Sequence, residues 1–133
     1  MANNYIQATV YPEIHKSLLT GKELITLEFA GFSVEDWDQS GNLYLYVEEG
    51  FIEEDEDEDG NKFNIFDIFQ NVIKRSESSE EVDPIKDIII EGAFTCSKMR
   101  PGEFGGFVTR ISEGLVQYGS TSELLDQMRK EHL

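Results

Sequence analysis

Seven consecutive carboxylates, from Glu53 to Asp59, are the residues of this chain whose type and spacing most clearly suggest a chemical role. Glu48 and Glu49 lie just upstream, so the segment 48–59 holds nine acidic residues in twelve. An extended strand advances by about 3.3 Å per residue, close to the ~3.4 Å per phosphate along one strand of DNA. The segment therefore has the charge density of a polyanion and could occupy a cationic groove built for nucleic acid.

The rest of the charge is distributed unevenly along the 133 residues, which carry 27 acidic and 11 basic side chains and a net charge of −16. Residues 1–83 hold 20 acids and 5 bases, a net charge of −15, whereas residues 84–133 hold 7 acids and 6 bases, a net charge of −1. Such a charge argues against nucleic acid or an anionic membrane as the direct partner and favours a basic or neutral protein surface. A solvated loop is the simpler explanation of an acidic run. Self-repulsion costs folding stability, however, so the further acids in the same half favour a functional role.

A second acidic stretch surrounds the single tryptophan, Trp37. An indole beside carboxylates suits either the half-exposed edge of a core or the apolar anchor of an interface. Tyr44 or Tyr46 could supply such an anchor instead.

The acidic run also matches the first half of a calcium-binding loop, with Asp55, Asp57 and Asp59 at alternate positions followed by Gly60. The match ends there, because Phe66 occupies the position that requires a bidentate glutamate. The sequence therefore predicts no formed metal site, and loose binding of divalent ions is the stronger expectation. A calcium-responsive binding domain remains one alternative.

Catalytic groups are sparse, since the side chains able to act as base or nucleophile are His15, His132, Cys96 and scattered hydroxyls. No Ser-His-Asp order, phosphate-binding loop or dinucleotide-binding glycine pattern occurs. We therefore expect a protein that is not an enzyme and uses no cofactor. A lone cysteine, no secretion signal and a longest apolar run of three isoleucines at 88–90 predict a cytoplasmic protein without a membrane span.

The first half of the chain is predicted to consist mainly of strands, which hold the acidic segments in place. Alternation of apolar and polar residues predicts strands at 5–11 and 24–29, and β-branched and aromatic residues predict one at 43–47. These three strands are expected to form an antiparallel meander, with a short helix or loop at 13–19. The run 53–60 offers no apolar surface for packing and is expected to be an acidic loop.

The second half of the chain predicts two helices and three strands. Asn64 as N-cap and an apolar stripe predict a helix at 64–76, followed by a polar link at 76–84. Strands are expected at 88–96, 104–111 and 115–118, with a hairpin at 106–118 and a final helix at 121–131. Residues 1–133 are thus predicted to form a single α+β domain, an antiparallel sheet of five to six strands with both helices packed on it.

Small size, strong acidity, the run Glu53–Asp59 and the lack of a catalytic motif make the chain resemble the DNA-mimicking inhibitors of phages and mobile elements, such as anti-CRISPR and antirestriction proteins. Those proteins share charge and size rather than a sequence motif. The resemblance implies a binding protein that occludes a nucleic-acid-binding surface of a defence complex inside a bacterial host cell, and an immunity protein that neutralises a basic toxin is the alternative. The residues expected to contact the partner are Glu35, Asp36, Trp37, Asp38, Glu48, Glu49, Glu53, Glu54, Asp55, Glu56, Asp57, Glu58 and Asp59.

Overall fold

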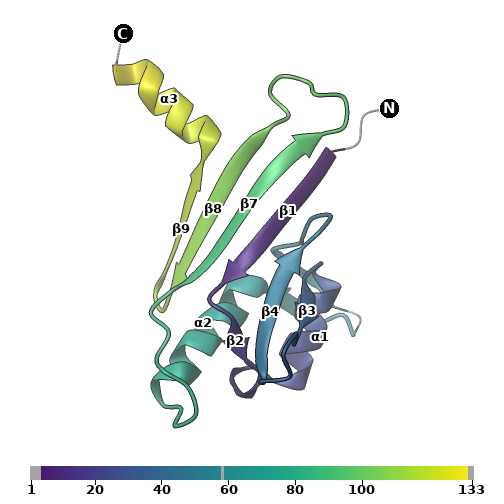
Figure 1. Ribbon diagram of the computed structural model, residues 1–133, viewed down its shortest axis with the longest axis vertical. Coiled ribbons are helices and arrows are strands. Elements are labelled where there is room, and N and C mark those ends of the chain that lie inside the picture. The colour runs from purple at the N-terminus through teal and green to yellow at the C-terminus, as the bar shows by residue number, and fades with distance from the viewer. Residues whose placement is uncertain (1–3, 58, 132–133) are drawn as a thin grey trace.

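The computed structural model describes residues 4–57 and 59–131, which form an α+β fold built on a mainly antiparallel sheet of seven strands (Figure 1). The strands of this sheet are β1 (Asn4–Tyr11), β2 (Ile14–His15), β3 (Ser33–Glu35), β4 (Asn42–Val47), β7 (Ile88–Cys96), β8 (Gly105–Ser112) and β9 (Leu115–Ser120). The helices are η1 (Lys16–Leu18), α1 (Gly21–Phe29), α2 (Ile65–Glu77) and α3 (Thr121–Glu131), and a small hairpin joins β5 (Glu54–Glu56) to β6 (Lys62–Asn64).

Strand β1 lies at the centre of the sheet, whose order is β2-β4-β1-β7-β8-β9 with β3 beside β4. Thr9 of β1 fixes the register on both sides, because it is opposite Tyr46 of β4 and opposite Glu91 of β7. Three segments that are far apart in the sequence therefore contribute side chains to one face of the sheet.

The hydrophobic core lies between one face of the sheet and the helices α1 and α2, which are behind the sheet in Figure 1. Successive strand residues point to opposite faces. The core-facing residues include Ala8, Val10, Leu43, Leu45, Ile88, Ile90 and Ile111, all buried. The alternate residues, such as Gln7, Thr9 and Glu91, are exposed on the opposite face, which we call the open face.

Several sequence predictions are confirmed. Strands occupy 4–11, 42–47 and 88–96, and β8 and β9 form the expected hairpin. The helix expected at 64–76 is α2, and the Asn64 side chain caps it by accepting a hydrogen bond of 2.9 Å from the Phe66 N–H. Phe69, Val72 and Ile73 of its apolar stripe are almost completely buried against the sheet.

The strand predicted at 24–29 is wrong, because these residues belong to helix α1. Thr20 and Glu23 form a capping box, in which Thr20 Oγ1 accepts from the Glu23 N–H and Glu23 Oε1 accepts from the Thr20 N–H. Leu24 and Leu27 then pack toward the core at helical spacing. The expected three-stranded meander is consequently absent from the described chain, and β1 pairs directly with β4.

Two segments expected to be irregular are more ordered than predicted. Residues 54–56 of the expected acidic loop form β5, which pairs with β6, although all three side chains are exposed. In the polar link at 76–84, Ser76 is fully buried and its hydroxyl accepts a hydrogen bond of 2.8 Å from the Ile85 N–H. Backbone pairing and one buried hydroxyl thus order segments that have little apolar surface of their own.

The C-terminal helix α3 was expected to pack on the sheet, but it projects from the end of β9 away from the body of the protein (Figure 1). None of its residues is buried, and Leu124, Leu125 and Met128 are about half exposed. Its start is fixed by two hydrogen bonds, from the Glu123 N–H to Ser120 Oγ and from the Gly106 N–H to Thr121 Oγ1. Across residues 4–57 and 59–131, no helix is long and apolar enough to cross a membrane.

An ion pair between Glu23 and Arg75 joins α1 to α2, and it should make stability depend on pH. Burial raises the pKa of the Glu23 carboxyl, but hydrogen bonds from Arg75 and from the Thr20 N–H outweigh burial and hold that pKa below its ordinary value of 4.5. The pair therefore stabilises the fold fully above pH 4.5, and this stabilisation is lost as the pH falls through the lowered folded-state pKa.

We expect Glu23→Gln to reduce the unfolding free energy at pH 7 and to have little effect once the carboxyl of the parent protein is protonated. Urea unfolding followed by far-UV circular dichroism, at a series of pH values from 7 down to 2, measures how this difference changes as the carboxyl takes up its proton. A loss that stays the same across the whole series would show that the charge of Glu23 is not what stabilises the contact.

Candidate functional site

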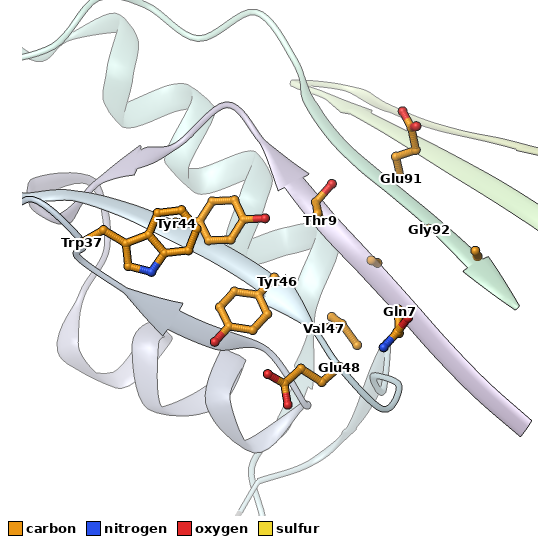
Figure 2. Close-up of a pocket in the computed structure, with 11 residues that line it drawn as sticks. Gln7, Thr9, Trp37, Tyr44, Tyr46, Val47, Glu48, Glu91 and Gly92 are labelled. Carbon is orange, nitrogen blue, oxygen red and sulfur yellow. The ribbon is translucent and has the colours of Figure 1, made fainter. Parts of the chain in front are cut away.

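Three aromatic rings form a continuous stack on the open face of the sheet, over β4 and the residues after β3 (Figure 2). The ring centroids of Trp37 and Tyr44 are 4.5 Å apart, and those of Tyr44 and Tyr46 are 5.4 Å apart. Tyr44 and Tyr46 share a face because they are two residues apart on β4. Trp37 joins them because β3 pairs with β4 and places Glu35, two residues earlier, opposite Tyr44.

Glu35 holds the two ends of this stack in place. Its Oε1 accepts a hydrogen bond of 3.0 Å from the Tyr46 hydroxyl, and its Oε2 accepts a hydrogen bond from Trp37 Nε1. The hydrogen bond to Glu35, together with burial and the nearby charge of Glu48, raises the pKa of Tyr46 above its ordinary value. The stack is therefore oriented by a carboxylate and lies in a negative electrostatic field.

Beside the rings lies a hollow of about 550 Å³, in the size range of ligand-binding pockets. We call it the aromatic hollow, and Figure 2 shows the side chains around it. It is lined by Gln7, Ala8, Thr9, Trp37, Tyr44, Tyr46, Val47, Glu48, Glu91, Gly92 and Ala93. Glu48, directly after β4, and Glu91, on β7, add two exposed carboxylates, and no described lysine or arginine lines the hollow.

A second acidic surface lies on the opposite side of the sheet, at the hairpin β5–β6, which we call the acidic hairpin. Glu54, Asp55 and Glu56 form β5 and are exposed. Glu54 and Asp57 line a separate groove between the hairpin, α1 and α2. Burial and the charges of Glu53 and Glu54 raise the pKa of Tyr118, which lies near α2 on the core side of β9.

The structure therefore divides the predicted contact residues between two faces. Trp37 and Glu48 line the aromatic hollow and Glu35 binds two of its rings, whereas Glu54 and Asp57 line the groove on the helical side. Glu49 is exposed after the end of β4, Asp59 is exposed at the turn of the hairpin, and Glu58 lies outside the described residues. The acids do not form one continuous surface.

Three of the predicted carboxylates are engaged by their own loops. Asp36 Oδ2 accepts a hydrogen bond of 3.0 Å from the Gly41 N–H, and Asp38 Oδ1 accepts one of 3.1 Å from the Ser40 N–H. Asp57 Oδ1 accepts from the N–H groups of Asp59 and Asn61 and so closes the turn of the acidic hairpin. These side chains shape the loops that carry the acidic surfaces.

Most of the negative charge is not neutralised within the fold. Over the described ranges, the carboxylates within 4.0 Å of a basic nitrogen are those of Glu23, Glu81 and Asp87. Exposed carboxylates without a cationic neighbour repel one another, and a basic partner would relieve that repulsion. The arrangement is suited to binding a cationic surface.

Sequence reasoning missed Glu91, Gln7 and Thr9 as residues of the hollow. The alternation in 5–11 placed Gln7 and Thr9 on one face of a strand, but nothing local indicated that Glu91 lies opposite Thr9. Comparison with known proteins found no matching family model, and no curated protein or solved structure significantly similar to this chain.

Proposed function

We propose that this protein is an acidic binding protein that occludes a basic, nucleic-acid-binding surface of a partner, such as a bacterial defence complex, without catalytic turnover. The observation that carries this proposal is the exposed row of carboxylates on β5, which has no cationic neighbour within ion-pair distance in the described chain. Binding to Lys and Arg of the partner would neutralise it, as phosphates do.

The geometry of the acidic hairpin supports this proposal. Pairing with β6 holds residues 54–56 extended, so Glu54 and Glu56 project from one face of the hairpin about 6.6 Å apart and Asp55 projects from the other. The strand therefore carries about one charge per 3.3 Å of its length, a linear charge density comparable to that of one DNA strand. Because the strand is already ordered, less conformational entropy is lost on binding than for a flexible acidic loop.

Displacement of nucleic acid tests the proposal directly. The probe is a fluorescent DNA duplex bound to purified basic components of restriction and CRISPR complexes, and its anisotropy is followed as the acidic protein is added at 50 mM and at 500 mM salt. We expect displacement from at least one component, and we expect it to weaken steeply at high salt because exposed charge pairs are screened.

Two charge-matched variants locate the effect. Glu54→Gln, Asp55→Asn and Glu56→Gln together remove three charges from the hairpin, and Glu123→Gln, Asp126→Asn and Glu131→Gln remove three from α3. Loss of three contacts worth a few tenths of a kcal/mol or more each should weaken displacement about 10-fold for the hairpin variant only. Equal weakening by both variants, or no displacement from any component, would overturn the proposal.

A further inference from the structure

We propose that the aromatic hollow on the open face binds an arginine side chain of the partner, with its guanidinium group stacked on the rings and paired with the surrounding carboxylates. This inference rests on the proposed function in one respect, that the partner surface is basic. It assigns a contact on the face opposite the acidic hairpin, which the proposed function does not use.

The rings supply the stacking surface. Trp37 is at one end of the stack, so that one face of the indole is not covered by Tyr44, and the residue is 69% exposed. A guanidinium group is planar and stacks on aromatic rings, and tryptophan is the best aromatic acceptor for a cation. Together with Tyr44 and Tyr46 the indole forms an aromatic surface rimmed by polar residues, which is typical of an interaction site.

The stack is oriented before any ligand binds. The two hydrogen bonds accepted by Glu35 fix Trp37 and Tyr46, which lie at opposite ends of the stack. Fixed rings lose little side-chain entropy on association, which favours affinity. The same carboxylate contributes negative charge beside the rings, where a stacked cation would lie.

The charges around the hollow are complementary to a cation. Glu48 and Glu91 are exposed on its lining, and the nearby Arg110 of the open face already donates hydrogen bonds to Asp87 (2.8 Å) and to Gln117 (2.8 Å). The carboxylates of the hollow therefore have no intramolecular arginine among the described contacts. A carboxylate can accept two parallel hydrogen bonds from a guanidinium but not from an ammonium group, which favours arginine over lysine.

Two labelled peptides test this assignment on the full-length protein: one with arginine at every second position separated by glycine, and one with lysine at the same positions. Fluorescence anisotropy gives their dissociation constants. We expect the arginine peptide to bind at least 5-fold more tightly than the lysine peptide, and we expect its binding to quench the fluorescence of Trp37, the only tryptophan of the chain.

Variants of exposed residues identify the surface that the peptide contacts. Trp37→Ala, and Glu48→Gln combined with Glu91→Gln, should each weaken binding of the arginine peptide about 10-fold. Phe104→Ala removes another exposed aromatic side chain outside the hollow, and the hairpin variant removes three charges from the opposite face; both should stay within about 3-fold of the parent.

Equal affinity for the two peptides, or unchanged affinity after Trp37→Ala, would overturn the arginine site. If DNA displacement still depends on the hairpin in that case, the proposed function stands without it. Conversely, arginine selectivity that depends on Trp37 would support the site even where the protein displaces no DNA, and only the proposed function would then fail.

Discussion

Phe69→Ala is expected to lower the free energy of unfolding by about 3–5 kcal/mol, because a fully buried ring is removed and a cavity remains. Phe69 is the largest completely buried side chain, and its ring meets that of Phe32 edge to face at 5.8 Å. It connects α2 to the segment that leads from α1 into β3. Small domains are stable by about 5–15 kcal/mol in total, so this single change should remove a large share of the stability of the fold.

Urea unfolding followed by far-UV circular dichroism measures the loss, with Phe29→Ala as the control. Phe29 also contacts another ring, that of Phe63 at 6.0 Å, but it is 41% exposed, so we expect a loss of at most about 1.5 kcal/mol. Similar losses for the two variants would show that the core is not centred on α2.

Gly31→Ala is expected to destabilise the fold by about 2–4 kcal/mol, from backbone strain and overpacking together. Gly31 has a φ of +113°, in a region that side chains disfavour. A Cβ there would lie 2.3 Å from the Gly50 carbonyl oxygen and 3.1 Å from Phe51 Cα, both backbone atoms. The chain turns at Gly31 from α1 toward β3, so the substitution would separate β3 from the segment 50–51.

The matched control is Gly21→Ala at the first position of α1, where a Cβ would meet no atom within 4 Å. Alanine favours a helix by up to about 1 kcal/mol over glycine, so we expect this change to be neutral or slightly stabilising. A melting temperature of Gly31→Ala equal to that of Gly21→Ala would contradict the close approach of the two backbone segments.

Local patterns in the sequence predicted most of the sheet. Alternation identified 5–11, β-branched and aromatic residues identified 43–47, and the apolar stripe with the Asn64 cap identified α2, because these signals arise within a few residues of one another. Helix α1 is mistaken for a strand because, over so short a stretch, its apolar residues 24, 25, 27 and 29 fit the alternation of a strand as well as the 3.6-residue period of a helix. The capping box at Thr20 and Glu23 was the deciding signal.

The site was less predictable because it depends on pairing between distant segments. The sequence offers Trp37, Tyr44 or Tyr46 as an apolar anchor, and the structure stacks the three rings together. The placement of Glu91 required the register between β1 and β7, which no local pattern specifies. The expected single acidic surface divides because Glu48, directly after β4, lies on the open face, whereas Glu54 and Asp57 lie on the helical side.

Because α3 projects from the body of the protein, its side chains add nothing to the stability of the core. Natural selection can then retain its apolar residues only for binding. Since no side chain of α3 is buried, substitutions of Leu124, Leu125 or Met128 leave the core intact. Evolutionary drift should therefore replace these apolar residues freely in related chains. Their retention at helical spacing would mark α3 as a contact surface for another molecule, whereas their replacement by polar residues would mark it as a solvated extension.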